Sequence, residues 1–562
     1  MNPRRDSRLR FTAASLSPAV LALLVAAAAA SPAMSRQEDH ACAGPVGWVP
    51  GEILERPVPI RDGVGRTHDP VTTTSADAQA FYDQGVAYLH SYVWIEAARS
   101  FHQALRLDPD LAMAYVGLSR AYSGLEDPGA AKATLLKARS LAPRAGDRER
   151  RRIELRGKQL EAMEESSNAQ KLIDYRKTID EALVLDGGDA ELWLIRGNAE
   201  EPTAAGRGQR GGLASTLYYE RVLALDPDNF AAHHYLVHSF ETIGRIDDAL
   251  RQGEIYARLA PMIPHAHHMY GHDLRRVGRI EEAIERFRRA DELEQAYYAS
   301  EKIPASLDWH HKHNLDLLST SYQYLGRMRT AEDLMKEAAA GDSVTDYLEF
   351  NRKEWPAFLL SRSRYEEALA AARALATGKW AVSRAAGHAL MGEVHLATGK
   401  IDAARSELAE AEVALESAPL VAPGISLPRG AAQPLVDELR AGILLRTGKQ
   451  AEARAIFIEV ERRTRAIPGP DAWSQALFRL EEIARAAREA GDWELADLTA
   501  RQMIEHDPSY AGSHLAAGLA AEHTGDAAGA RRELAEAERL WRAADPDLPE
   551  LAQIRSKIAA SR

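Results

Sequence analysis

Cysteine is almost absent from this chain: its 562 residues include one, Cys42. An intrachain disulfide is therefore excluded, and packing must supply the stability of the fold. The sequence also has no phosphate-binding loop, no His-Glu-x-x-His helix, no Gly-x-Ser-x-Gly elbow and no Cys-x-x-Cys-His haem attachment. These absences exclude the enzyme and cofactor classes that the four motifs identify, so no recognised catalytic motif is present.

Long apolar runs are also missing, apart from one near the start. Residues 18–30 are rich in Ala, Leu and Val, follow four arginines and precede the small residues of 31–33. This run has the length of a secretory signal core and is too short to span a bilayer. We therefore predict that residues 1–33 are a signal peptide, that the protein is exported (periplasmic or extracellular), and that it has no transmembrane span.

Positive charge is in deficit. Lys and Arg number 70 against 82 Asp and Glu, which gives a formal net charge of −12. Removal of the signal peptide takes away four Arg and one Asp, so the charge becomes −15. Because an acidic surface repels phosphate backbones, we do not expect nucleic acid as a partner. One charged stretch, residues 144–165, is expected to form a long, solvated helix.

What the chain has instead is a repeat of about 34 residues. In the unit from Ala78 to Pro109, small and bulky residues stand where two helices would cross, and a proline follows the second helix. The apolar stripes of two short helices cannot be buried by one unit alone, so neighbouring units must stack into a continuous core. Turn glycines recur in later units, at Gly244, Gly278, Gly326, Gly399, Gly448, Gly491 and Gly525.

This pattern resembles the tetratricopeptide repeat (TPR) family over roughly residues 75–545. The resemblance implies an all-α, right-handed TPR solenoid of antiparallel helix pairs. One residue departs from the family pattern, since Tyr92 stands where a glycine usually joins the two helices. The residues that carry the match in the first unit are Gly85, Ala97, Phe101, Ala104 and Pro109.

The repeat and the Pro/Gly-rich stretches predict how the chain is divided. A linker is expected to separate two segments of the array. The expected order is the signal peptide (1–33), a largely irregular N-terminal extension (34–74), a TPR array with a His-rich groove (75–415), the Pro/Gly linker (416–433), C-terminal TPR units (434–545) and a C-terminal tail (546–562).

Histidine is concentrated in one part of the array. The chain has 19 histidines, so chance would place about three in the stretch 233–313, and ten are found there. They fall on three successive predicted first helices of the repeats. Imidazole is the commonest metal ligand in proteins, so this cluster is the feature that most directly suggests chemistry.

The resemblance also supplies a register for these residues. In a TPR unit, positions 2, 5, 9 and 12 of the first helix line the concave groove, and counting from the turn glycines places the clustered side chains there. We therefore expect them to face solvent in one shared groove, where helices about 8–10 Å apart bring imidazoles to one ion. The predicted metal ligands are His234, His238, Glu241, His265, His268, His272, His310 and His313.

The identity of the ion is left open among divalent metals and copper. Met269, within the His-rich run, leaves copper open, whereas Glu241 and Asp316 would suit zinc, iron or manganese. The number of candidate ligands exceeds what one tetrahedral ion needs, so a second ion or an open catalytic position is also left open.

Not every histidine is assigned to the site. His233 and His267 fall at a helix-packing position, and they are interpreted as buried core residues, as are His388 and His514. Groove histidines elsewhere can also serve only as polar contacts for a bound peptide, and this interpretation is kept beside the metal site. Whether His40, Cys42 and His68 of the N-terminal extension join the site is left open.

Three functions compete at this stage. The first is an exported TPR scaffold that binds a protein or peptide partner in its concave groove, with a metal or polar histidines in that groove. The second is a periplasmic metal carrier or sensor. The third is a metal-dependent enzyme in which Glu241 or Glu201 acts as the base. The repeat architecture favours the scaffold, and the surplus of ligands favours the other two.

Overall fold

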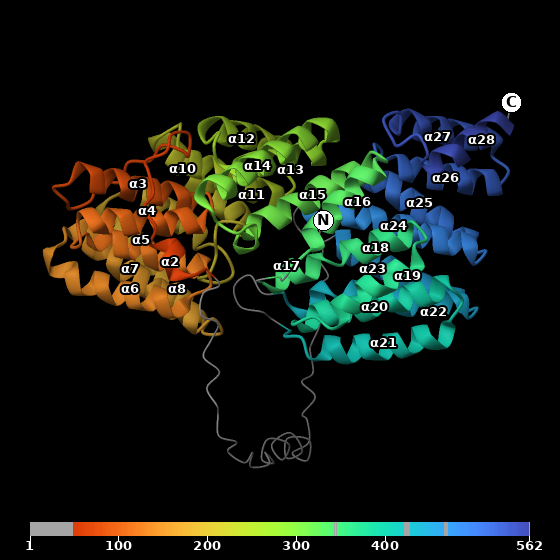
Figure 1. Ribbon diagram of the computed structural model, residues 1–562, viewed down its shortest axis with the longest axis horizontal. Coiled ribbons are helices and arrows are strands. Elements are labelled where there is room, and N and C mark those ends of the chain that lie inside the picture. The colour runs from red at the N-terminus through yellow and green to blue at the C-terminus, as the bar shows by residue number, and fades with distance from the viewer. Residues whose placement is uncertain (1–48, 342, 344, 421–426, 466–469, 561–562) are drawn as a thin grey trace, which may run out of the picture. The chain divides into compact units, whose positions relative to one another are not determined.

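The computed structural model describes residues 49–341, 343, 345–420, 427–465 and 470–560, with the side chains of 464–475 left aside. The first half of the described chain is helical throughout (Figure 1). Its helices are α2 (Gly51–Leu54), α3 (Ala76–His90), α4 (Trp94–Leu107), α5 (Ala112–Gly124), α6 (Pro128–Leu141), α7 (Asp147–Glu164), α8 (Ala169–Leu185), α9 (Ala190–Asn198), α10 (Gly212–Leu225), α11 (Phe230–Thr242), α12 (Ile246–Leu259), α13 (Pro264–Arg276), α14 (Ile280–Glu301) and α15 (Trp309–Tyr324).

The second half continues the same pattern. Its helices are α16 (Met328–Ala339), α17 (Asp346–Asn351), α18 (Glu354–Ser361), α19 (Tyr365–Ala376), α20 (Ala381–Ala397), α21 (Ile401–Glu416), α22 (Gln433–Arg446), α23 (Gln450–Arg465), α24 (Pro470–Glu489), α25 (Trp493–His506), α26 (Ala511–His523), α27 (Ala527–Leu540) and α28 (Pro549–Ala560). Successive helices pack as pairs, such as α11 with α12 and α13 with α14. The predicted all-α solenoid of helix pairs is confirmed.

Small residues allow the two helices of a pair to approach each other. A Cβ atom on Gly271 would lie 2.7 Å from the ring of Phe287, which is fully buried. The same relation holds in the first unit, where a Cβ on Gly85 would lie 2.6 Å from the Phe101 ring. The turn residue Gly244 has φ +77°, a conformation that is strained for residues with a Cβ. These positions explain why the repeat keeps glycine at the helix crossing and at the turn.

The charged stretch forms a long helix, as expected, but it is only partly solvated, because Glu149, Arg152 and Arg156 are buried. Helix α7 carries Arg152, which is 4% exposed and forms ion pairs with Asp69 and Asp189. Arg156 is also buried and donates hydrogen bonds to the hydroxyl and carbonyl of Ser119. Paired carboxylates and satisfied donors offset the cost of burying the arginines, and sequence periodicity alone does not reveal such partners.

Segments outside the repeats also differ in part from the predicted division. The described part of the N-terminal extension packs on the array, with Ile53, Leu54 and Val64 buried. Helices α20 and α22 contact each other directly across the predicted linker, whose residues 421–426 lie outside the described part of the chain. The predicted tail forms helix α28, which packs on α27.

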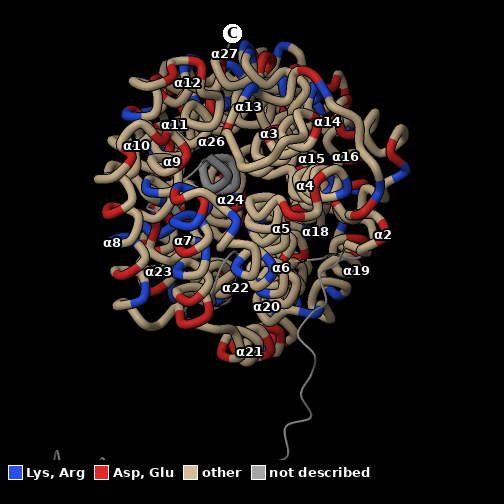
Figure 2. The backbone as a smooth tube through the Cα atoms, turned by 90° about the vertical axis from the view of Figure 1, so that its left-hand side faces the viewer, with Lys and Arg blue, Asp and Glu red and all other residues tan. Residues whose placement is uncertain are grey.

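Charge is mixed along the described helices, where Figure 2 shows acidic and basic residues interspersed. No helix in the described residues combines the length and apolar character needed to cross a membrane. The predicted signal peptide lies outside the described residues.

Candidate metal centre

The clustered histidines come from the first helices of three successive repeats, α11, α13 and α15. All of them are buried, and none of the seven predicted histidine ligands is more than 9% exposed. This contradicts the expectation that they face solvent in an open groove. Their rings pack against one another and against Tyr92 and Trp309 instead.

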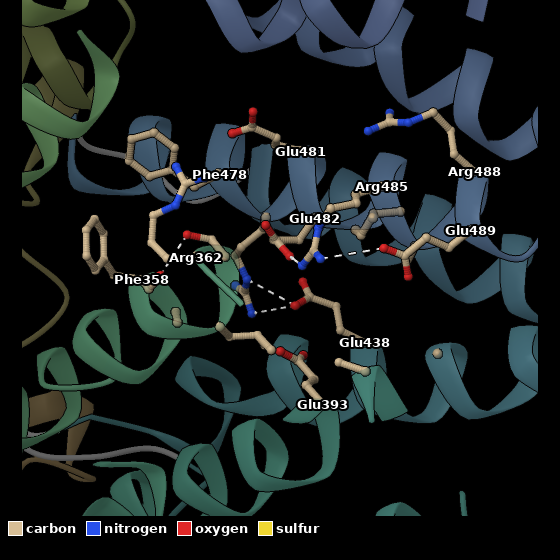
Figure 3. A pocket seen from close by; sticks show the side chains of 18 of the residues that line it. Phe358, Arg362, Glu393, Glu438, Phe478, Glu481, Glu482, Arg485, Arg488 and Glu489 are labelled. Atoms are coloured by element: carbon tan, nitrogen blue, oxygen red, sulfur yellow. Dashed lines mark hydrogen bonds and ion pairs between the residues drawn. The ribbon is translucent and has the colours of Figure 1, made fainter. Parts of the chain in front are cut away.

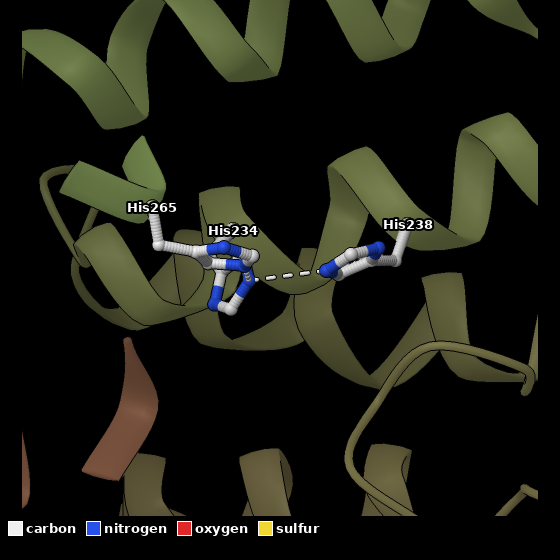
Figure 4. A group of neighbouring side chains, drawn as sticks. All are labelled: His234, His238 and His265. Atoms are coloured by element: carbon white, nitrogen blue, oxygen red, sulfur yellow. Dashed lines mark hydrogen bonds between the residues drawn. The ribbon is translucent and has the colours of Figure 1, made fainter. Parts of the chain in front are cut away.

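Three of these histidines form a compact group on α11 and α13, which we call the first triad: His234, His238 and His265. The Nε2 atom of His234 lies 3.1 Å from Nε2 of His238 and 3.1 Å from Nε2 of His265 (Figure 4). Ligands at about 2.0–2.1 Å from a tetrahedral ion lie about 3.4 Å from one another. The three nitrogens therefore already have nearly the spacing that one ion requires.

A second group, the second triad, joins α13 to α15 through His268, His272 and His313. One nitrogen from each lies within 4.8 Å of the others. The ring centroids of His268 and His272 are 4.4 Å apart, and those of His268 and His313 are 4.7 Å apart. The prediction of one shared space thus resolves into two adjacent groups, because His265 turns toward α11 while His268 and His272 turn toward α15.

The seventh histidine, His310, lies between the two triads. Its ring centroid is 5.0 Å from that of His265 and 4.7 Å from that of His268. Its Nδ1 atom contacts the buried carboxylate of Glu294, and its Nε2 atom is buried without a hydrogen-bond partner. An imidazole oriented by a carboxylate with its other nitrogen unpaired is a common arrangement at metal sites.

In one histidine of each triad, hydrogen bonds determine which ring nitrogen is protonated and which carries the lone pair. His234 Nδ1 lies 2.6 Å from the carbonyl oxygen of His90, so it must donate, and its Nε2 atom carries the lone pair. In the second triad, the amide nitrogen of Asn314 donates to the carbonyl of Phe287, which leaves the amide oxygen to accept from His268 Nδ1 at 2.9 Å. His268 Nε2 is then buried, unprotonated and without a hydrogen-bond partner.

Glu241 lies behind the ligand nitrogens rather than among them. Its two carboxylate oxygens are each 3.7 Å from an Nδ1 atom, one of His238 and one of His272. This position suits a carboxylate that orients one imidazole of each triad. Asp273 lies beside it, and burial together with the neighbouring Glu241 charge raises the pKa of Asp273 well above its ordinary value.

Three of the clustered imidazoles are held in the neutral form. Burial lowers the pKa of His234, His265 and His268 well below the ordinary value, and neighbouring histidines lower it further. Neutral imidazole is the form that binds metal. These three side chains therefore have an unprotonated ring nitrogen available as a ligand.

Two aromatic side chains cover the triads. Tyr92 lies over the first triad, with its ring centroid 4.7 Å from that of His234 and 5.1 Å from that of His265. Its backbone has φ 58°, an uncommon conformation for a residue with a side chain. Trp309 packs against His265, His310 and His313. In the sequence, this cover is indicated by Tyr92, which stands where the family pattern usually has glycine.

Of the histidines assigned to packing, His233, His267 and His514 are buried, as predicted, whereas His388 is only partly buried. His233 and His267 each place Nε2 3.0 Å from the carbonyl oxygen of the proline six residues earlier. His514 repeats this contact with Pro508 at 2.7 Å, and His388 contacts Glu407 at 2.8 Å. Packing contacts therefore explain the histidines at this position of the repeat, and a histidine in a repeat is not by itself evidence of a metal ligand.

Other predicted residues lie apart from the triads. Glu201 accepts a hydrogen bond from the backbone of Gln209 at 2.6 Å, and its role there is to hold a loop. His68 is exposed and contacts Asp83 at 2.9 Å. Asp316 lines a small cavity with Lys312 and Trp355. His40 and Cys42 lie outside the described residues.

A third cluster was not foreseen from the sequence. Asp291, Glu294 and His311 bring a carboxylate or imidazole atom within 4.8 Å of one another on α14 and α15. Although burial acts to lower it, the pKa of His311 is raised by its hydrogen bond to Glu294 and by the charge of that carboxylate. A protonated His311 explains this cluster as an ion pair, so it needs no metal.

Comparison with known protein families gives one sequence match. The sequence profile of the tetratricopeptide repeat matches residues 112–144. A search of curated proteins finds no significant sequence match.

Similar solved structures include a tetratricopeptide repeat protein from Parabacteroides merdae, which is 12% identical, with a TM-score of 0.33, over 50% of this chain and 97% of its own. Yeast Tom70 is 14% identical, with a TM-score of 0.32, over 86% of this chain and 95% of its own. TM-scores this low carry no information about a shared site. The profile match, the repeated helix pairs and the glycine contacts with buried rings together identify the chain as a tetratricopeptide repeat protein.

Proposed function

We propose that this protein is an exported TPR scaffold whose array holds two transition-metal ions, one in each histidine triad. TPR arrays generally bind protein partners, and the concave groove is the surface for a protein or peptide partner in this proposal. The ions are resident rather than carried, because the ligands are buried and already oriented. Zinc and copper suit all-imidazole ligand sets best.

The observation that carries the proposal is the fixed tautomer of His234. Its Nδ1 hydrogen is used by the His90 carbonyl, so its Nε2 lone pair faces two further Nε2 atoms at 3.1 Å. One lone pair cannot form a linear hydrogen bond with two donors at once. A cation placed among the three nitrogens would satisfy all of them, and the spacing is close to that of a tetrahedral site.

Each ion would join neighbouring repeats. The first triad connects α11 to α13, and the second connects α13 to α15. Repeats of a solenoid contact only their neighbours, so a bond between first helices sets the local orientation of the array. In this proposal the metal fixes the geometry of three consecutive repeats for partner binding.

Metal counting tests the proposal. The purified chain is dialysed against Zn²⁺ or Cu⁺ and its bound metal is measured by mass spectrometry, with about two ions per chain expected. His238→Ala and His313→Ala should each lose one ion, since each triad needs three imidazoles. The matched control is His233→Ala, which removes a buried packing histidine on α11 and should keep both ions. Equal metal content in all four proteins, or no binding at micromolar concentration, contradicts the proposal.

A further inference from the structure

A separate cavity lies among the C-terminal repeats. Its volume is about 460 Å³, within the range of about 300–1,000 Å³ that small-ligand sites occupy. It is lined by residues of α18, α20, α22, α24 and α26, and none of the clustered histidines is among them. We call it the C-terminal cavity. Aromatic rings form part of its wall, including Phe358 and Phe478 (Figure 3). Tyr510 also lines it.

Most of the charged groups that line this cavity are already paired. Arg479 pairs with Glu438 at 3.1 Å, and Arg446 pairs with Glu489 at 2.6 Å. Further pairs join Lys353 to Glu354, Arg362 to Glu550 and Arg485 to Glu482. Arg488 also lines the cavity, and its Nη1 atom is buried without a hydrogen-bond partner among the described residues. With Arg488 included, the lining has seven carboxylates and six basic side chains, so one carboxylate is in excess.

Glu393 is the carboxylate left over. No hydrogen bond or ion pair of its carboxylate is found within the described residues. The charges of Glu438 and Glu482 act to raise its pKa, and those of Arg479 and Arg485 act to lower it. Burial, followed by the charge of Glu438, raises the pKa of Glu393 to about 8. Glu481 is satisfied differently, because it accepts a hydrogen bond from the hydroxyl of Tyr510 at 2.6 Å. Glu393 is thus the lining carboxylate that has neither an ion pair nor a hydrogen bond among the described residues.

We propose that the C-terminal cavity binds an organic cation with an apolar body, whose ammonium or guanidinium group pairs with Glu393 and Glu438. The apolar body packs against the aromatic wall. The cation supplies the charge that the lining lacks, and a carboxylate pair in a partly buried site gives it a strong, charge-assisted hydrogen bond. This ligand chemistry is found both in free amines and in the basic side chain of a peptide beside an apolar residue.

Calorimetry of the full chain at pH 7.0 tests the proposal with matched probes. 2-Phenylethylamine is compared with the neutral 2-phenylethanol and the anionic 3-phenylpropionate, and N-acetyl-Phe-Lys-amide with the norleucine analogue. We expect the charged amine or the lysine peptide to bind at least about tenfold more tightly than its neutral match. Binding by the amine identifies a free ligand, and binding by the peptide alone identifies a peptide side chain.

Proton release gives a second readout. Because Glu393 is mostly protonated at pH 7.0 and must ionise to pair with a cation, binding should release up to about one proton, seen as a dependence of the enthalpy on the buffer. Glu393→Gln should abolish that release and weaken binding at least about tenfold. Glu354→Gln, which removes a lining carboxylate already paired with Lys353, is the control and should bind within twofold of wild type.

Several results would overturn this proposal. They are equal binding of the amine and the alcohol, preference for the anion, no binding of any cationic probe at millimolar concentration, or unchanged affinity in Glu393→Gln.

Discussion

The groups that matter most for the proposed metal centre are those that hydrogen-bond the histidines from behind. Glu294 holds His310, Asn314 holds His268, and the His90 carbonyl holds His234. Such partners fix the ring and its tautomer before any ion binds. They also supply hydrogen-bond partners for imidazoles that are buried close together.

Glu294→Gln tests this role. The amide keeps the shape of the side chain but removes the charge that orients His310. The Nε2 atom of His310 is buried between the two triads without a hydrogen-bond partner and is the candidate fourth ligand, so metal affinity should fall about 10–100-fold while some binding remains. Glu292→Gln, an exposed change on the same helix, is the control and should have no effect. Competition with a metallochromic dye measures both affinities. If the two variants bind alike, Glu294 does not support the site.

A pair of neighbouring histidines separates packing from ligation. His267→Ala removes a buried contact with the Pro261 carbonyl and should destabilise the fold by about 1–3 kcal/mol, with both ions kept. His268→Ala should also destabilise the metal-free fold, because His268 is fully buried, and should lose one ion. Thermal melts and metal counts distinguish them. Loss of metal in His267→Ala with full occupancy in His268→Ala would reverse the assignment.

At the scale of the helix, the centre is built by three first helices that are neighbours in the array. Helix α13 contributes to both triads, since His265 reaches α11 while His268 and His272 reach α15. The three histidines share one face of α13, because they are three and four positions apart. His265 reaches α11 from the first turn of the helix, and the other two reach α15 from the turns that follow. The positive φ of Tyr92 places an aromatic ring over the first triad at the end of another helix pair.

Hydrogen exchange should show whether a bound metal links α11, α13 and α15. Metal binding stabilises the conformation that holds all ligands, so local opening of α11, α13 and α15 becomes rarer. We expect slower amide exchange in these three helices when metal is added, with α24 and α26 unchanged as an internal control. Uniform slowing, or none, measured by mass spectrometry of peptic peptides, would show that the ion does not bind between these repeats.

Acid sensitivity is a property of the whole molecule. The pKa values of His234, His265 and His268 are lowered in the folded chain, whereas in the unfolded chain they are about 6.5. Below pH 6.5 the unfolded chain therefore binds more protons than the folded chain. The metal-free fold should lose stability as the pH falls below about 6.5, by up to about 1.4 kcal/mol per pH unit for each such histidine.

Melting temperatures of the metal-free protein at pH 7.5, 6.5 and 5.5 measure this effect. A variant with His234, His265 and His268 all changed to Gln is the comparison, and its melting temperature should change less between pH 6.5 and 5.5. Saturating metal should raise the melting temperature at pH 7.5, and this gain should shrink on acidification because the ligands must be neutral. Identical pH dependence in the two proteins would exclude the triads as its source.

The sequence by itself determined the repeat, the helix pairs and the helices that carry the histidines, because these depend on spacings within about 34 residues. It also separated His267 from His268 by register alone. The split into two triads and the burial of the groove were decided by tertiary structure. His90 lies 144 residues before His234, and Asn314 lies 46 residues after His268, so no local pattern reveals these contacts. Stacking of distant repeats brings them together, and only that stacking fixes which nitrogen each imidazole presents.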